Sequence, residues 1–473
     1  MIYLPQKQTS ILIKPLLGKP TMSIHQIDIV RSYYSSPRLN FTGFLQVFDS
    51  KIKPLTILAA SFSLVAAVYT APSFAVTDPV VLTFSTVGDS RQDPQNIDPS
   101  VKQNAQVGVG NCTVPFNVGS NTTGLVPNPG LSGQDCKWLQ NSAAWSRIMR
   151  TIQSQKANLL FFNGDMIMGY GKAGVPVTRN LTGVSEAAIT SPAISDIVNS
   201  DLMQTYKQYA FWRGMVANLM ETGTYVVPVP GNHEVQCKRC NKAAQVENEN
   251  AWRDNMGDLI LDPTRFSTLL GTAPQNFSVT NTPSIGGTDG ITTNQQQLSY
   301  SFDVGASHFV VINTDPVGKD GYAPTNWLET DLSAAEGHGA KRIFVFGHKP
   351  AIFYNYVGSA ASSTSSLNDK NATAAIAFWN VITYHKATYF SGHEHTYHVS
   401  QPYGLSSYQV LVGAGGSPFE TSTPTFVAND RMYSWATVKI FQSGKVQMDT
   451  YGFDDTMTNP VVKLESIQLP TLP

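Results

Sequence analysis

Residues 389–398 of the chain read YFSGHEHTYH and hold three of its nine histidines. Histidine is the commonest side-chain ligand of metals in proteins. In an extended segment, residues two apart point the same way, so His393 and His395 are expected to face one point. A solvent-exposed polar turn is the alternative reading of this stretch, and the remainder of the chain decides between them.

Five short apolar runs, including this one, end in the same way: a glycine is followed by Asp, Asn or His. Runs of this length rich in Val, Phe, Leu and Tyr are typical of buried strands. The terminal glycine lets the backbone turn sharply and approach a bound group. The runs are VVLTFSTVGD up to Asp89, ANLLFFNGD up to Asp165, TYVVPVPGNH up to His233, RIFVFGH up to His348 and KATYFSGHEH up to His395.

Helical patterns separate several of these runs. Apolar residues recur at three-to-four spacing in residues 141–155, 203–220 and 372–386. Alternation of strands and helices predicts an α/β fold with mostly parallel pairing. In such sheets, ligands bind beyond the carboxyl ends of the strands, where the Asp, Asn and His residues follow. One shared site explains all five runs better than five separate caps or core residues.

The predicted site offers three oxygen and three nitrogen donors. This mixture suits Zn, Fe or Mn better than Ca, which prefers oxygen ligands throughout. A single catalytic zinc takes three protein ligands and a water, so six donors fit two metal ions that share a carboxylate. The predicted ligands are Asp89, Asp165, Asn232, His348, His393 and His395.

The five blocks, in this order, resemble the calcineurin-like metallophosphoesterases. The block letters are GD at Asp89, GD at Asp165, GNHE at residues 231–234, GH at His348 and GHEH at residues 392–395. Within that family, VFGH at residues 345–348 and VGAGGS at residues 412–417 are similar to purple acid phosphatases. The resemblance extends over residues 80–453.

The resemblance implies a four-layer α/β/β/α sandwich of two mixed sheets with a two-metal centre. It implies that Asp89 and His395 bind the first metal and that Asp165 bridges both. The second metal would be held by Asn232, His348 and His393. The resemblance gives His233 a catalytic place beside the substrate, with Asn232, where it stabilises the phosphoryl group and helps protonate the leaving oxygen.

Two positions depart from the family pattern. Purple acid phosphatases have G-D-x-x-Y in the second block, whereas this chain has Met168 in the tyrosine position and Tyr170 two residues later. Other members have a His two residues after the first Asp, whereas this chain has Arg91. The first metal would therefore be one protein ligand short, to be completed by water, Asp93 or another residue. Arg91 could grip a substrate phosphate or pair with a carboxylate.

These observations predict a metal-dependent phosphoesterase that hydrolyses phosphate monoesters of small molecules, as acid phosphatases do. Two cations would make a water acidic enough to supply hydroxide, which attacks phosphorus in line. A phosphodiesterase or nucleotidase with the same centre is one alternative. A surface-binding protein with structural metals is another. A net charge of −1 and a pI near 6.7 give no signal for nucleic-acid binding.

The first 75 residues are expected to lie outside the folded domain. Lys51 and Lys53 precede the apolar residues 55–71, and Ser73 and Ala75 follow, which is the layout of a secretory signal peptide. We therefore expect residues 1–50 to be an over-extended start and residues 51–75 the signal. Residues 80–455 would form the catalytic domain and 456–473 a C-terminal tail. The protein would be secreted or periplasmic, and membrane-bound only if the signal stays uncleaved.

All four cysteines follow the predicted cleavage point. An even number in an exported chain favours disulfides, and the expected pairs are Cys112–Cys136 and Cys237–Cys240, since each closes a local loop. A redox-active or zinc-binding function of Cys237 and Cys240 is the alternative.

Overall fold

The computed structural model describes part of the chain, and residues 75–473 form one compact unit. Residues 1–77 lie outside the described part, and with them the predicted start and signal segments. Asp93, Tyr170 and Cys112 lie outside it as well. No helix in the described ranges is long and apolar enough to cross a membrane. Those ranges are 78–91, 133–169, 171, 201–237, 240–353, 366–417, 419, 432–454 and 459–473.

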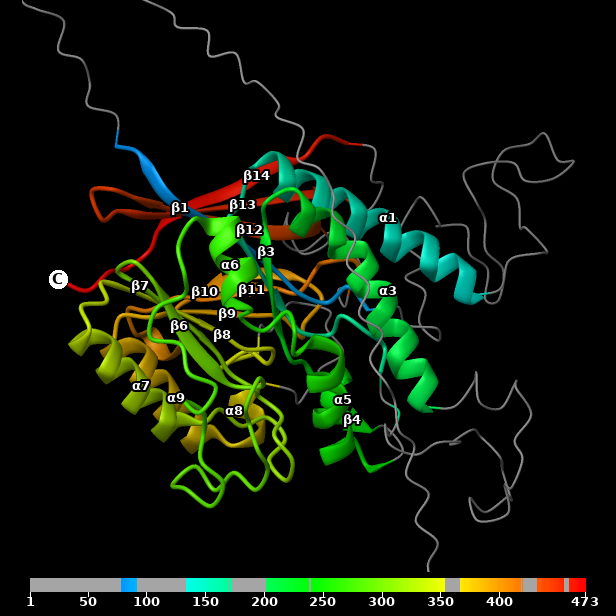
Figure 1. The fold of residues 1–473 in the computed structure, drawn as a ribbon, viewed down its shortest axis with the longest axis horizontal. Helices are drawn as coiled ribbons and strands as arrows, with labels where there is room; N and C mark the ends of the chain where they lie inside the picture. The colour runs from blue at the N-terminus through cyan, green and yellow to red at the C-terminus, as the bar shows by residue number, and fades with distance from the viewer. Residues whose placement is uncertain are drawn as a thin grey trace, which may run out of the picture. The chain divides into compact units, whose positions relative to one another are not determined.

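The first sheet has the strand order β14-β13-β12-β1-β2-β3. Figure 1 shows β12, β13 and β14 of this sheet together in the orange-to-red part of the chain. Strands β1, β2 and β3 are parallel, as the strand–helix alternation predicts, whereas β12, β13 and β14 pair antiparallel. The strands are β1 (Val80–Val87), β2 (Leu159–Asn163), β3 (Tyr225–Val229), β12 (Met432–Phe441), β13 (Val446–Asp454) and β14 (Val462–Gln468).

The second sheet has the order β10-β11-β9-β8-β7-β6. Its four central strands are parallel, and β6 and β10 are antiparallel edges. The strands are β6 (Tyr300–Val304), β7 (Ser307–Val311), β8 (Arg342–Phe346), β9 (Thr388–Ser391), β10 (Tyr397–Ser400) and β11 (Gln409–Val412). Both large sheets are therefore mixed.

Phenylalanines join the two sheets face to face. Successive strand residues point to opposite faces, so the adjacent Phe161 and Phe162 serve different layers. The Phe161 ring stacks on Phe346 of the second sheet, with centroids 3.8 Å apart. Phe162 points the other way, into the helical layer, where it meets Trp145 and Trp212 edge-to-face. One pair of neighbouring residues thus fixes three layers.

Helices cover the outer faces of both sheets. Trp145 lies on α1 and Trp212 on α3, which cover the first sheet, and Phe378 of α9 packs against Tyr389 on the outer face of the second. This arrangement confirms the predicted four-layer α/β/β/α sandwich. The helices and the small remaining strands are α1 (Gly133–Ser154), α3 (Asp201–Glu221), α4 (Asn232–Val235), β4 (Gln236–Cys237), β5 (Ala243–Ala244), α5 (Val246–Met256), α6 (Pro263–Leu270), α7 (Thr325–Gly337), α8 (Leu367–Lys370), α9 (Ala372–Tyr384) and η3 (Pro402–Gly404).

The C-terminus differs from the predicted tail. Strand β14 pairs antiparallel with β13 and forms the edge of the first sheet, and Leu469 after it is buried. The sheet therefore continues past residue 455. The strand is only partly buried and carries Lys463 and Glu465, so its sequence resembles an exposed polar segment. Between β4 and the following turn, Cys237 and Cys240 form the predicted disulfide, with their Cα atoms 5.1 Å apart.

A buried imidazole ties α7 to the second sheet. His308 of β7 lies between two carboxylates: its Nδ1 is 2.5 Å from Asp303 Oδ1 on β6, and its Nε2 is 2.9 Å from Asp331 Oδ2 on α7. Burial lowers the pKa of His308, but hydrogen bonds to the two carboxylates outweigh it and raise the pKa to about 9. The protonated ring can donate from both nitrogens.

This arrangement predicts a stability difference that depends on pH. A raised folded-state pKa gives stability that is complete below the unfolded pKa of 6.5 and is lost as pH rises through about 9. We expect His308→Gln to lower the free energy of unfolding by about 3–5 kcal/mol at pH 6. The difference from wild type should shrink by about 3 kcal/mol by pH 10.

Urea unfolding of wild type and variant at both pH values measures this difference. His338→Gln is the matched control, because His338 is exposed. An equal loss for His308→Gln at both pH values would show that the His308 charge contributes nothing to stability.

Candidate metal centre

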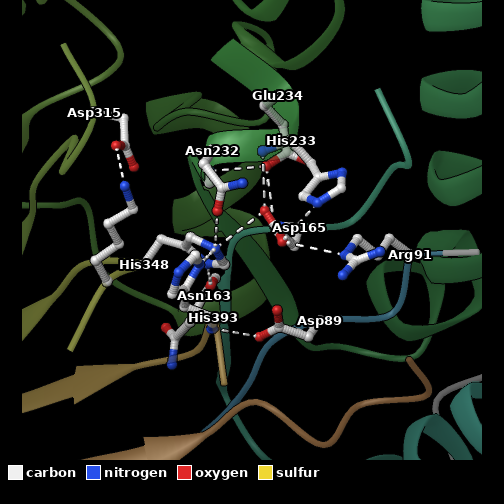
Figure 2. Close-up of polar contacts among 12 residues, drawn as sticks. Asp89, Arg91, Asn163, Asp165, Asn232, His233, Glu234, Asp315, His348 and His393 are labelled. Carbon is white, nitrogen blue, oxygen red and sulfur yellow. Dashed lines mark hydrogen bonds and ion pairs between the residues drawn. The ribbon is translucent and has the colours of Figure 1, made fainter. Parts of the chain in front are cut away.

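Strand register brings the block residues to one edge of each sheet. Val87 pairs with Phe162, and the next residues bond in turn, with the Asp89 amide donating to the Gly164 carbonyl. In the second sheet, the Gly392 amide donates to the His348 carbonyl in the same way. The predicted ligands therefore follow neighbouring strand ends, and Figure 2 shows five of them close together: Asp89, Asp165, Asn232, His348 and His393.

The VGAGGS segment connects the two sheets at this edge. The Gly88 amide donates to Val412 O, the Gly415 amide donates to Gly88 O, and the Ser417 amide donates to Asp89 O. Residues 412–417 follow β11 of the second sheet, whereas Gly88 and Asp89 follow β1 of the first. These bonds hold the first block against the loops of the other sheet.

Three of the predicted ligands have left-handed backbone conformations. The φ angles are 62° at Asp89, 53° at Asp165 and 77° at His393. Residues other than glycine seldom adopt positive φ, and such residues cluster at functional sites because the surrounding structure must hold them there. Close packing explains the glycine that precedes Asn232. A Cβ on Gly231 would lie 2.5 Å from Asp165 Oδ1 and 2.7 Å from Glu234 Oε2, so a larger residue would not fit there.

One donor group surrounds the Nε2 atom of His348. This nitrogen lies 2.9 Å from Asn232 Oδ1, 3.1 Å from Asp165 Oδ1 and 3.1 Å from His393 Nδ1. The other ring nitrogen, Nδ1, lies 2.7 Å from the Asn163 carbonyl and donates its proton there. In the neutral ring that metals bind, Nε2 then carries a lone pair facing other lone pairs. A cation turns this repulsion into ligand bonds, so the four side chains fit a metal ion.

A second donor group contains Asp89, Asp165 and His395, whose ligand atoms lie within 4.8 Å of one another. His395 Nε2 is 3.5 Å from Asp89 Oδ1. That carboxylate oxygen is buried and accepts no hydrogen bond from the described residues. Leaving such an oxygen without a partner is costly, and a cation would satisfy it. Asp165 belongs to both groups, and its role as the bridging ligand remains a prediction.

The clustered groups shift one another's pKa in opposite directions. Burial raises the pKa of Asp89 well above its usual value, despite the nearby His348. Burial acts on Asp165 in the same sense, but the imidazoles of His233 and His348 outweigh it and hold its pKa well below the usual value. Burial lowers the pKa of His348, but Asp165 and Asp89 raise it to about 9. Opposed shifts gathered in one buried cluster are typical of functional sites.

The prediction that His393 and His395 lie in an extended strand and face one point is wrong. Strand β9 ends at Ser391, and residues 393–396 form a bend. The positive φ of His393 turns the two rings apart, so His393 meets His348 while His395 meets Asp89. The histidines therefore belong to adjacent donor groups that share Asp165, as the family resemblance implies.

Arg91 reaches into the centre and pairs with its shared carboxylate (Figure 2). Its Nε lies 3.3 Å from Asp165 Oδ2 and its Nη2 lies 3.2 Å from His395 Nε2. Its Nη1 lies 3.7 Å from the sulfur of Met168, the residue in the tyrosine position. Of the two roles predicted for Arg91, the structure shows the carboxylate contact. A phosphate contact remains a prediction.

His233 stands beside the centre and belongs to neither donor group of the described residues. Its Nδ1 lies 2.6 Å from the Met168 carbonyl and donates there, while Nε2 lies 3.6 Å from Asp165 Oδ2. Burial and the positive charge of Arg91 hold the pKa of His233 well below its usual value. The ring is thus oriented through one nitrogen, with the other turned toward the centre.

Glu234 has a positioning role that the sequence did not reveal. Its carboxylate accepts four backbone hydrogen bonds, from the amides of Asp165, Met166, Ile167 and Gly231, at 2.8–3.1 Å. Burial and the Asp165 carboxylate raise its pKa to about 7. The fourth letter of the GNHE block was the available signal, but its partners are backbone groups, which leave no pattern in a sequence.

We expect Glu234→Gln to weaken both the fold and the centre. Glutamine has one acceptor oxygen, so its amide group would face backbone donors, at a cost of about 2–4 kcal/mol in the free energy of unfolding. Because Asp165 loses its support, metal affinity should fall roughly 10- to 100-fold. Urea unfolding and metal titration measure the two effects, with exposed Glu221→Gln as control. Unchanged metal affinity would show that Glu234 does not position Asp165.

Several solved structures are similar to the chain. The chain is similar to the purple acid phosphatase PPD1 from yellow lupin (Lupinus luteus) seeds, with 11% identity and a TM-score of 0.45 over 83% of this chain and 54% of that one. It is also similar to a dimetal phosphatase from Danio rerio, with 13% identity and a TM-score of 0.40 over 83% of this chain and 99% of that one. It is similar as well to GAP50, the anchor in the inner membrane complex of Plasmodium, with 11% identity and a TM-score of 0.41 over 84% of this chain and 90% of that one. The chain thus spans about half the length of the lupin protein.

None of the curated proteins compared with the chain matches it significantly. The family assignment comes from the sequence pattern: residues 138–397, more than half of the chain, match the family described as calcineurin-like phosphoesterase. That range contains five of the six predicted metal ligands, and the structure brings the sixth, Asp89, to them. The chain therefore belongs to the calcineurin-like phosphoesterases, a family of phosphoric ester hydrolases.

Proposed function

We propose that the protein is an exported phosphoesterase that hydrolyses phosphate monoesters of small molecules with the help of two metal ions. The observation that carries the proposal is the pair of donor groups that share Asp165. The second ion would be held by Asn232, His348 and His393, and the first by Asp89 and His395. Bound cations would supply Lewis acidity and lower the pKa of water, so that hydroxide forms near neutral pH. Their donor types suit Fe, Zn or Mn.

The protein's own groups would handle charge and protons around the phosphoester. His233 donates from Nδ1 to the Met168 carbonyl, so its Nε2 is the atom directed at substrate. The negative charge of a bound phosphoryl group would favour the protonated ring. Nε2–H could then stabilise the phosphoryl oxygens and give its proton to the leaving oxygen. Asp165 Oδ2 lies 3.6 Å from the same Nε2 and 3.3 Å from Arg91 Nε, so both side chains influence the charge beside it.

Turnover of two aryl phosphates tests the function. We expect protein reconstituted with Mn²⁺, Zn²⁺ or Fe to hydrolyse para-nitrophenyl phosphate, and chelated protein to be inactive until metal is restored. Faster turnover of bis(para-nitrophenyl) phosphate would replace the monoesterase proposal with a phosphodiesterase. Stoichiometric metal without turnover of either ester would overturn the enzyme proposal and favour a binding protein with structural metals.

Export is supported by the basic, apolar and small-residue pattern of residues 51–75 and by the Cys237–Cys240 disulfide, which suits an oxidising compartment. N-terminal sequencing of protein recovered from an exporting host tests it. We expect a mature start at or close to residue 76, outside the cytoplasm. Uncleaved protein retained in the cytoplasm would contradict export, whereas uncleaved protein in the membrane fraction would make the segment an anchor.

A further inference from the structure

The side chain of Arg91 occupies the surroundings of the first donor group. Its Nε faces Asp165 Oδ2 at 3.3 Å and its Nη2 faces His395 Nε2 at 3.2 Å. The side chain is 12% exposed, so these contacts are largely shielded from water. The guanidinium thus contacts two of the three residues that would bind the first metal ion.

The chemistry of the two partners fixes the direction of these contacts. A guanidinium donates hydrogen bonds and has no acceptor, so His395 Nε2 must be the acceptor. A neutral imidazole nitrogen has one lone pair in the ring plane, and a metal ion would bind through that same lone pair. Hydrogen bonding of His395 to Arg91 and ligation of a metal by His395 therefore exclude each other.

The charge of Arg91 acts in the same sense. Asp89 and Asp165 are two buried carboxylates in one cluster, and a buried anion needs a cation nearby. The guanidinium supplies one positive charge in direct contact with Asp165. A metal ion at the first group would have to displace this charge, and its own charge would repel the guanidinium. In the other donor group, His348 Nε2 lies against Asn232 Oδ1, Asp165 Oδ1 and His393 Nδ1.

We propose that Arg91 is a built-in cation that competes with metal at the first site, so that the protein binds one metal ion tightly and a second only by displacing Arg91. The tight ion lies at Asp165, Asn232, His348 and His393. This inference depends on the metal requirement of the proposed function. It adds that the two sites differ in affinity because of a single side chain.

Metal titration of the chelated protein tests the inference without reference to activity. With Mn²⁺ as the probe, followed by calorimetry and by equilibrium dialysis with elemental analysis, wild type should bind one equivalent tightly. The second equivalent should be at least about 100-fold weaker. In Arg91→Met, which removes the charge and keeps the length, the second equivalent should tighten roughly 10-fold or more. Arg91→His, which adds a donor, should bind two equivalents tightly.

Electron paramagnetic resonance gives an independent readout. With one equivalent of Mn²⁺, wild type should show an isolated ion, whereas Arg91→Met and Arg91→His with two equivalents should show an exchange-coupled pair. Arg213→Met is the matched control, because Arg213 pairs with Asp258 near the surface and should leave both affinities unchanged. Circular dichroism confirms that each variant is folded.

The outcomes separate this inference from the proposed function. Two equally tight equivalents in wild type would overturn the role of Arg91 and leave a two-metal phosphoesterase. One tight equivalent in wild type that Arg91→Met and Arg91→His leave unchanged would also overturn it. Failure of wild type to bind any tight equivalent would contradict the metal dependence on which the proposed function rests.

Discussion

Asp165→Asn should lose most of its bound metal and at least about a thousand-fold in turnover of para-nitrophenyl phosphate, because the shared charge that holds two cations is removed. Asparagine has the same size as aspartate but carries no negative charge. Its amide group would lie against the ring of His348, where the wild-type protein has a carboxylate oxygen. Elemental analysis after dialysis and steady-state kinetics at saturating Mn²⁺ measure the two losses.

Asp289→Asn separates loss of metal from loss of stability. Asp289 is buried, and its carboxylate accepts hydrogen bonds from the backbone amides of Asn326 and Trp327 at the start of α7. Its replacement should destabilise the fold yet leave the metal content unchanged. Metal at the wild-type stoichiometry in folded Asp165→Asn would show that Asp165 does not bridge the centre.

His233→Ala should keep its metal and lose roughly 100- to 10,000-fold in kcat, the range typical of a positioned proton donor. The side chain is outside both donor groups but 3.6 Å from Asp165. Burial and Arg91 hold the pKa of His233 well below its usual value. The protonated ring that would donate the proton therefore becomes populated only as pH falls toward this lowered pKa. In wild type, kcat/KM should therefore decline as pH rises through this pKa, and the variant should lack that decline.

Exposed His338→Ala is the control for this measurement and should behave as wild type. A metal-free His233→Ala would mean that His233 is a ligand. A variant that kept its metal and the wild-type pH profile would mean that another group moves the proton.

Much of the centre was readable because each ligand follows a buried apolar run at a strand end. Parallel pairing then brings distant residues together, as Val87 beside Phe162 brings Asp89 beside Asp165. The ligand grouping needed the family resemblance in addition, since spacing alone predicted His393 and His395 on one face. The backbone bend that separates them follows from a positive φ at His393, a conformation without a side-chain signature.

The contacts that orient the ligands could not be predicted, because backbone atoms make them. The carbonyl of Asn163 fixes the ring of His348, and the carbonyl of Met168 fixes the ring of His233. Strand β14 escaped prediction for another reason: an edge strand with polar residues on both faces lacks the alternation of a half-buried strand. The His308 ion pairs required Asp331, which is distant in sequence and lies on α7.

Anomalous scattering from a crystal of the protein grown with Mn²⁺ would locate the bound ions. We expect a strong anomalous peak within coordination distance of Asp165, Asn232, His348 and His393, and a weaker one beside Asp89 and His395. Crystals of active protein with no manganese at Asp165 would show that these residues do not form the metal centre.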